Sequence, residues 1–406
     1  MATLLYLVHR LPYPPNKGDK VRSWHLLRHL ASRHRVHLAT FVDDPDDWQH
    51  LPVLERHCAS VKAVPLHPRR ARLASLRGLL GGEALSLPYY RSNELAEWVD
   101  ALAQRETLDG TVVFSSTMAQ YAQRLADKPM LVDFVDVDSA KWSDYAPAHA
   151  WPLSWLYARE GRLLLDFERR VAAQARCSFF VTEKEVALFR ERARLASGQG
   201  AAPDRIEALG NGVDAEFFAP DPHRASPFPA GQLPLVFTGA MDYWPNIDAV
   251  QWFVADMLPR LRERFPTLHF HIVGRSPSPA VQALAGPQVS VSGTVPDVRP
   301  YLEHAAAVVA PLRLARGIQN KVLEAMAMAR PVVAARSCAA ALHGAREGQE
   351  LLAADDAGEW ITAVEQLLAD ATAASRIGSA ARAFVLHQHA WDAQLAGIDP
   401  YLESIA

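Results

Sequence analysis

Short apolar runs alternate with amphipathic stretches along most of the chain. Residues 3–8 form a compact apolar run, and Trp24, Leu27 and Leu30 recur at helical spacing before a second run at 36–41. This strand–loop–helix–strand order predicts the start of a parallel, doubly wound sheet. Further strands are predicted at 61–65, 111–114, 131–134 and 178–181, and a long helix at 155–174.

The alternation begins again in the second half of the chain. Residues 219–234 hold five prolines and little periodicity, which is typical of a segment between domains. The pattern therefore predicts an α/β protein with two doubly wound domains. We expect a first domain at 1–214, a linker at 215–233, a second domain at 234–388, and a C-terminal helix at 389–406 that packs back on the first domain. In the second domain, strands are predicted at 235–238, 269–273, 289–291, 307–310 and 332–334, and helices at 246–264, 298–304, 318–329, 357–368 and 373–387.

Length and charge agree with two domains that have different partners. The chain has 406 residues, half of them apolar, which suits two separate cores. Its net charge of −3 gives no sign of a nucleic-acid partner. Residues 1–205 carry 28 basic and 24 acidic side chains, or +4, whereas the rest carries 14 and 21, or −7. The basic half is expected to face anionic substrates or lipid headgroups.

Cysteine usage and hydropathy indicate a cytoplasmic protein. The three cysteines, Cys58, Cys177 and Cys338, are far apart, and such a sparse, odd set is typical of a reducing compartment. The apolar run near the N-terminus lacks a preceding basic segment and a cleavage site, so it predicts a strand rather than a signal peptide. No stretch approaches the roughly 18 apolar residues of a spanning helix. We expect contact with a membrane surface at most.

One segment carries the strongest chemical signal. Neither a GxGxxG nor a GK[ST] phosphate loop is present, but residues 310–328 read APLRLARGIQNKVLEAMAM. Gly317 there opens a predicted helix, whose first N–H groups favour phosphate. Lys321 adds a point charge for a diphosphate, and Glu324 is placed to accept hydrogen bonds from a ribose diol. The alternative is that both are solvated helix residues.

This segment resembles the nucleotide-sugar site of family 4 glycosyltransferases, which have the GT-B fold. The similarity rests first on Glu324-Ala325-Met326-Ala327 followed by Pro331-Val332-Val333. Four further features also match: the Gly18 loop, the Asn211–Asp214 turn, and the strand ends at Gly239 and Gly274. The strings YPPNKGDKVR, FTGAMDYWPN and GIQNKVLEAMAM further resemble the sugar transferases of PEP-CTERM/exosortase exopolysaccharide systems. The resemblance implies two Rossmann-like domains that face each other across a cleft. It also implies a donor site formed by Gly18, Gly239, Arg316, Gly317, Ile318, Gln319, Asn320, Lys321 and Glu324.

The sequence departs from this family at two places. Many members carry a glutamate where Arg316 stands, and many carry an arginine and a lysine after the first strand of the second domain, where residues 240–246 have no positive charge. Neutralising the diphosphate must therefore depend on Lys321, together with Arg313 or Arg316. The identity of the donor sugar is left open by the missing carboxylate.

Carboxylates in the first domain are candidates for work on the acceptor. Asp136 and Asp138 follow a predicted strand, so either is placed to orient or deprotonate an acceptor hydroxyl as a catalytic group. A helix cap or a structural ion pair is the alternative, and Asp133, inside the strand, is the weakest of the three candidates. Asp19, Lys141 and Trp142 are expected to bind the acceptor, and Gly18 is either part of the site or a plain turn glycine.

Arg69, Arg70, Arg72 and Arg77 stand among leucines, which is typical either of a helix lying on a membrane or of a solvated surface helix. His25 and His29 lie one helical turn apart without the HExxH pattern of a metal site. We expect neither a metal nor a cofactor.

The sequence thus predicts transfer of a sugar from a nucleotide-diphosphate sugar to a hydroxyl of a lipid-linked glycan in exopolysaccharide biosynthesis. Retention of configuration is implied by the family resemblance. A nucleotide-sugar epimerase of the same fold and a non-catalytic nucleotide-sugar-binding scaffold are the alternatives. The expected partners are a nucleotide sugar, a glycan or lipid-linked acceptor, and an anionic membrane surface.

Overall fold

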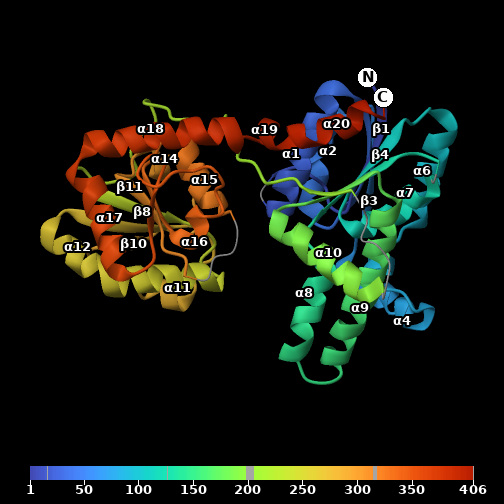
Figure 1. The fold of residues 1–406 in the computed structure, drawn as a ribbon, viewed down its shortest axis with the longest axis horizontal. Helices are drawn as coiled ribbons and strands as arrows, with labels where there is room; N and C mark the ends of the chain where they lie inside the picture. The colour runs from blue at the N-terminus through green and yellow to red at the C-terminus, as the bar shows by residue number, and fades with distance from the viewer. Residues whose placement is uncertain (16, 126, 198–204, 314–317, 406) are drawn as a thin grey trace. The chain divides into compact units, whose positions relative to one another are not determined.

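The chain folds into two compact units (Figure 1). The computed structural model describes residues 1–15, 17–125, 127–197, 205–313 and 318–405. Unit 1 comprises Met1–Gly210 and Leu395–Ala406, and unit 2 comprises Asn211–Gln394. Residues 215–233, expected to form a linker, are therefore part of unit 2. Arg224 fixes this segment there, because its Nη1 lies 2.7 Å from Glu303 Oε2 and its carbonyl oxygen lies 2.6 Å from His304 Nε2.

The described part of unit 1 holds a seven-stranded sheet in the order β3-β2-β1-β4-β5-β6-β7, with every pair parallel. The order reverses between β1 and β4, which is the switch point of a doubly wound sheet. The strands are β1 Thr3–Val8, β2 Arg35–Val42, β3 Ser60–Pro65, β4 Gly110–Phe114, β5 Met130–Val135, β6 Cys177–Phe180 and β7 Ile206–Ala208. The helices are α1 Gly18–Arg33, α2 Leu51–Glu55, α3 Pro68–Ser75, α4 Arg77–Gly81, α5 Ser86–Tyr89, α6 Asn93–Arg105, α7 Ala119–Ala122, α8 Asp138–Tyr145, α9 Leu153–Gln174, α10 Glu183–Ser197 and α20 Asp399–Glu403.

The described part of unit 2 holds a six-stranded parallel sheet in the order β10-β9-β8-β11-β12-β13, with its switch point between β8 and β11. The strands are β8 Leu233–Thr238, β9 Leu268–Val273, β10 Val289–Val291, β11 Ala307–Ala310, β12 Val332–Ala335 and β13 Leu352–Ala354. The helices are α11 Trp244–Trp252, α12 Leu258–Arg264, α13 Pro279–Gln282, α14 Arg299–Glu303, α15 Asn320–Ala327, α16 Arg336–Ala339, α17 Ala357–Ala369 and α18 Ala371–Gln388, and α19 Trp391–Leu395 leads back into unit 1. The prediction of two doubly wound parallel sheets is confirmed.

A buried ion pair holds the middle of unit 1 together. Arg22 of α1 places Nε and Nη2 at 2.7 and 3.1 Å from the two carboxylate oxygens of Asp133, and Nη2 also donates to the carbonyl of Leu209. Both side chains are 1% exposed. Asp133, the weakest of the three aspartate candidates, is therefore a structural residue, because its carboxylate is fully occupied inside the sheet.

One local prediction was wrong for an identifiable reason. The helix expected at 246–264 is interrupted by a π-helical turn at Phe253–Met257. Pro259 follows directly in α12, and a proline without an N–H group cannot continue the regular hydrogen-bond ladder. In the Asn211–Asp214 turn, a Cβ on Gly212 would lie 2.6 Å from Trp391 Cα. Close packing against Trp391 is what requires this glycine.

The C-terminal helix α20 packs on unit 1. His29 Nε2 of α1 lies 2.6 Å from Asp399 Oδ1, and the ring of Tyr401 lies edge-on to Phe179 with centroids 5.6 Å apart. His29 is therefore engaged with a carboxylate of α20. Among the described residues, no group of three or more His, Cys, Asp or Glu side chains is arranged around a metal position. No described helix is both long and apolar enough to cross a bilayer.

Candidate active site

Lys321 lies at the switch point of the second sheet. It belongs to the first turn of α15, which follows β11, and its Nζ lies 2.5 Å from Oδ1 of Asn246 at the start of α11. The same Nζ lies 4.2 Å from the centroid of the Phe237 ring in β8. Three elements that are distant in sequence therefore fix one cation near the carboxyl ends of β8 and β11, where doubly wound sheets bind their ligands.

Two glycines allow close packing beside this cation. A Cβ on Gly239, directly after β8, would lie 2.8 Å from Asn246 Nδ2 and 3.1 Å from Lys321 Nζ. A Cβ on Gly274, after β9, would lie 1.6 Å from the carbonyl oxygen of Gly239. The two loops therefore pack backbone against backbone, and a side chain at Gly239 would displace Asn246 and Lys321 from each other.

Burial sets the charge state of the pair on α15. It lowers the pKa of Lys321 to about 7, with the charge of Glu324 acting in the opposite direction. It raises the pKa of Glu324, with Lys321 opposing the shift. Because the cation lacks a carboxylate at contact distance among the described residues, an anionic ligand would supply the missing counter-charge.

The other predicted donor residues divide into three groups. Ile318, Gln319 and Asn320 immediately precede Lys321, with Gln319 at the N-cap position of α15 and an exposed Asn320. Arg316 and Gly317 lie outside the described residues. Arg313 is unsuited as a second cation for a diphosphate, because its guanidinium pairs with Asp248 and stacks 4.9 Å from the Trp252 ring.

Asn246 and Phe237 are site residues that sequence reasoning missed. Asn246 was expected only to begin a helix, yet its amide accepts from Lys321 and donates to the carbonyl of Ala240 at 2.8 Å. Its position in the sequence could have indicated this role, because Asn246 lies shortly after Gly239, which directly follows β8.

The structure brings together three candidates at the carboxyl end of β5 in unit 1. Lys141 Nζ lies 2.9 Å from Asp136 Oδ2 and 3.1 Å from Asp138 Oδ1. Burial lowers the pKa of Lys141, but attraction to the two aspartates outweighs it and raises that pKa overall. The predicted base candidates and the predicted acceptor-binding lysine therefore form one ion-pair cluster.

A second cluster surrounds the carboxyl end of β1. Asp19 Oδ2 lies 2.6 Å from Arg10 Nη1 and 3.4 Å from His9 Nε2. Burial alone would raise the pKa of Asp19, but the His9 hydrogen bond and the Arg10 charge lower it well below its ordinary value. Gly18 is the first residue of α1, and a Cβ there would meet nothing within 4 Å. Packing therefore does not require a glycine at position 18. His9, which contacts Asp19, was not among the residues that the sequence predicted for the site.

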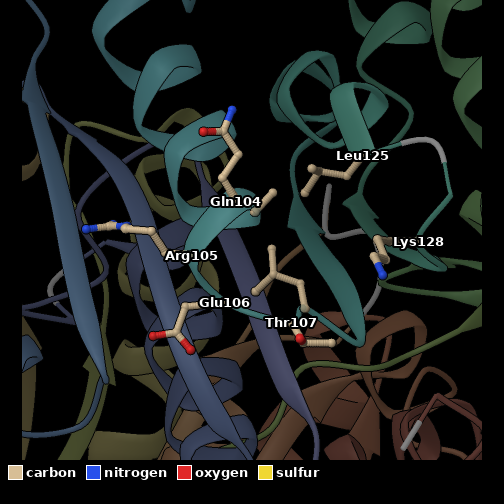
Figure 2. Close-up of a pocket in the computed structure, with 8 residues that line it drawn as sticks. Gln104, Arg105, Glu106, Thr107, Leu125 and Lys128 are labelled. Carbon is tan, nitrogen blue, oxygen red and sulfur yellow. The ribbon is translucent and has the colours of Figure 1, made fainter.

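Trp142 lines a cavity of about 350 Å³ in unit 1, together with Tyr89, Tyr90 and Tyr157. A second hollow, of about 220 Å³, is shown in Figure 2. It lies where α6 leads into β4 and where Lys128 precedes β5, which is the amino-terminal edge of the strands. Doubly wound sheets bind ligands at the opposite edge, so this second hollow is not the expected site. It is lined by Ala103, Gln104, Arg105, Glu106, Thr107, Leu108, Leu125 and Lys128.

Comparison with known proteins finds a family match within unit 2. Residues 233–370 match the family described as glycosyl transferases group 1. Comparison with curated protein sequences finds no significant match.

Among solved structures, sucrose-phosphate synthase from Thermosynechococcus elongatus is 18% identical, with a TM-score of 0.67 over 100% of this chain and 99% of that one. Anabaena HepE in complex with UDP is 15% identical (TM-score 0.65), and in complex with UDP-glucose 16% identical (TM-score 0.64), each with both chains covered completely. Because these identities are low, the similarity shows only that this chain shares the GT-B fold of those structures. With the group 1 domain in unit 2, the chain is a glycosyltransferase of the GT-B fold.

Proposed function

We propose that the protein transfers a sugar, with retention of configuration, from a nucleotide-diphosphate sugar to a hydroxyl of a lipid-linked glycan in exopolysaccharide biosynthesis. The observation that carries the donor is the half-buried Lys321 beside Gly239 at the switch point of the second sheet. The UDP and UDP-glucose bound to HepE, a protein of the same fold, support this donor class. The exopolysaccharide role rests on the sequence strings that resemble PEP-CTERM-associated transferases.

In this proposal, unit 2 stabilises the leaving group. Negative charge develops on the diphosphate as the glycosidic bond breaks, and Lys321 Nζ and the first N–H groups of α15 are positioned to stabilise it. Glu324, one helical turn further along, accepts hydrogen bonds from the ribose diol. In unit 1, Asp136 or Asp138 orients the acceptor hydroxyl, and Lys141 keeps both carboxylates in place.

The reaction itself is tested with the purified protein, a panel of radiolabelled UDP, GDP and ADP sugars, and a membrane lipid extract. Label that moves to the lipid fraction supports the proposal. Label that stays on the nucleotide but changes its sugar would indicate an epimerase, and binding without either reaction would indicate a scaffold. A donor analogue with one labelled anomeric carbon would then reveal the stereochemical course.

Donor affinity should depend on pH in a defined direction. Because the pKa of Lys321 is lowered to about 7, the free protein loses this charge as the pH rises above 7. Diphosphate binding then requires proton uptake, so the dissociation constant should rise toward about tenfold per pH unit between pH 7.5 and 9. Calorimetric titration at several pH values, in buffers of different ionisation enthalpy, measures both the affinity and the proton uptake.

The matched control for this pH dependence is Lys321→Arg, whose guanidinium stays charged throughout the range. Its donor affinity should be nearly flat from pH 7.5 to 9. An equally flat profile in the wild-type protein would contradict the proposed charge state of Lys321.

We also propose that unit 1 contacts the inner membrane surface through α3 and α4. Arg69, Arg70, Arg72 and Arg77 are exposed there, and no ion-pair partner of theirs is found among the described residues. Each basic side chain near an anionic surface contributes on the order of 1 kcal/mol. We therefore expect the protein to co-sediment with vesicles that contain anionic lipid, less so at high salt, and not with neutral vesicles.

The control for membrane contact compares two double variants of equal charge. Arg69→Gln/Arg70→Gln should lose much of the co-sedimentation, whereas Arg260→Gln/Arg376→Gln, at exposed positions of unit 2, should not. Equal recovery with anionic and neutral vesicles, or none with either, would remove the membrane contact. The assignment of the donor site does not depend on this outcome.

A further inference from the structure

The cavity beside Trp142 has a mainly apolar wall. It encloses about 350 Å³ between the α3–α5 segment and the α8–α9 hairpin of unit 1, within the range of about 300–1,000 Å³ that is usual for ligand sites. Three tyrosine rings, Trp142 and Leu156 provide most of the wall. The Trp142 and Tyr157 rings are 5.4 Å apart, and the Tyr89 and Tyr90 rings 4.8 Å apart.

Two charged residues behind this wall, Arg159 and Glu160, already have partners, whereas Arg72, which also lines the cavity, has no ion-pair partner among the described residues. The buried Glu160 accepts hydrogen bonds from the N–H groups of Leu85 and Ser86, at 2.6 and 2.9 Å, and from the Ser86 hydroxyl at 2.6 Å. Arg159 donates to the carbonyl oxygens of Gly78 and Glu83, at 2.7 and 3.1 Å. These bonds fasten α9 to the α3–α5 segment, and they leave no unpaired charge on Glu160 for a ligand. The wall therefore favours a ligand that is mostly apolar and carries an anionic group that Arg72 can pair with.

One end of the cavity reaches the carboxyl edge of the first sheet. Tyr90 lines it, and its ring centroid lies 5.7 Å from that of His9, which directly follows β1. Trp142 lines it as well, and the preceding Lys141 holds Asp136 and Asp138. A molecule in the cavity would thus have one end next to the proposed acceptor groups.

The same helices carry exposed apolar side chains. In Figure 1 the α8–α9 hairpin, in green, extends away from the rest of unit 1 with α4 near its side. Such large apolar side chains, exposed together, are typical of a surface that meets lipid or another apolar partner. They are Leu73, Leu76, Leu79 and Leu80 on α3–α4, and Tyr145, Trp151, Leu153 and Trp155 at the hairpin.

The charge of these two segments favours a lipid over other apolar partners. No acidic residue occurs from Leu66 to Gly82 or from Tyr145 to Arg159, whereas the first stretch carries four exposed arginines. Tryptophan and tyrosine beside arginines, without acidic residues, form the surface that interfacial proteins present to anionic lipid. An exposed apolar surface for a second protein would not require this one-sided charge.

We propose that this cavity binds the hydrocarbon segment of an anionic amphiphile, with its anionic group at Arg72 and its uncharged polar end directed toward Asp136, Asp138 and His9. The inference rests on the proposed function, because it makes the amphiphile the lipid part of the acceptor. It restricts the acceptor class: a sugar acceptor without a hydrocarbon chain would leave the cavity empty and would be a poor substrate.

The binding test uses 11-(dansylamino)undecanoic acid, whose fluorescence rises in an apolar environment. The wild-type protein should bind it, undecanoic acid should displace it, and maltose should not. Leu156→Trp fills the cavity and should weaken probe binding about tenfold or more, because a packed interior has little room to adjust. Leu195→Trp, the same change at an exposed position on α10, should bind the probe within about twofold of wild type. Absence of wild-type binding, equal binding by Leu156→Trp, or displacement by maltose would overturn the proposal.

A second measurement uses only the wild-type protein and so does not depend on whether a variant folds. Photolysis of the wild-type protein with a diazirine-bearing undecanoic acid should label peptides from residues 72–90 or 142–160, and labelling only elsewhere would overturn the proposal. The thermal shift produced by the nucleotide reports on unit 2 separately. If that shift is absent while the probe still binds, the donor assignment fails and the cavity assignment stands.

Discussion

Replacing Lys321 with alanine is expected to slow sugar transfer about 10²–10³-fold at saturating donor, which is the usual cost of removing one preorganised group that stabilises transition-state charge. Lys321 is the only lysine after residue 205, and Asn246 and Phe237 hold its Nζ in place. The Michaelis constant for the acceptor should change little, because the proposed acceptor groups lie in unit 1. Initial rates measured at varied donor and acceptor concentrations separate these effects.

The control for this change is Lys184→Ala, which removes an exposed lysine from α10 and should leave the rate unchanged. Full activity of Lys321→Ala would contradict its role. The charge on the diphosphate would then have to be stabilised by Arg316, or by an Arg313 released from Asp248.

Replacing Glu324 with glutamine is expected to weaken donor binding by about 1.5–3 kcal/mol, roughly tenfold to 150-fold, because the ribose would lose a charged hydrogen-bond acceptor. The substitution should not lower the thermal stability of the protein. Burial raises the pKa of Glu324 in the folded protein, so its ionisation costs stability as the pH rises above the ordinary pKa of the carboxyl group. Glutamine removes that cost. At pH 8 the variant should therefore melt at the same temperature as the wild type or higher, while binding donor more weakly.

Calorimetry with the donor and thermal melting measure these two effects. Glu263→Gln, at an exposed position of α12, is the matched control and should change neither. If Glu324→Gln binds donor as tightly as the wild-type protein, the carboxylate does not contact the ribose.

The repeating strand and helix pattern predicted both sheets because the central strands are mostly apolar runs. Buried parallel strands such as β8 and β11 have this signature. β7 and β13 were missed, because each has only three residues and, unlike the equally short β10, at most one β-branched residue. α10 was missed as well, since residues 183–197 carry many charges that weaken the apolar periodicity.

Contacts between distant segments were beyond sequence reasoning. Lys321 was predicted from the helix that carries it, but its partner Asn246 is 75 residues away and meets it only because β8 and β11 are neighbours. Asp133 pairs with Arg22, which is 111 residues away. By contrast, the Lys141 cluster is local, since Asp136 and Asp138 lie five and three residues before the lysine. A local ion pair was one of the alternatives that the sequence left open.

The measurement that tests the central claim most directly compares a nucleoside diphosphate with its nucleoside. The nucleotide that gives the largest thermal shift is chosen first, and calorimetric titration then gives both dissociation constants for the wild-type protein and for Lys321→Ala. If Lys321 holds the donor diphosphate, the wild type prefers the diphosphate strongly, and the variant loses most of that preference while its affinity for the nucleoside stays the same. An undiminished preference for the diphosphate in Lys321→Ala would contradict the account.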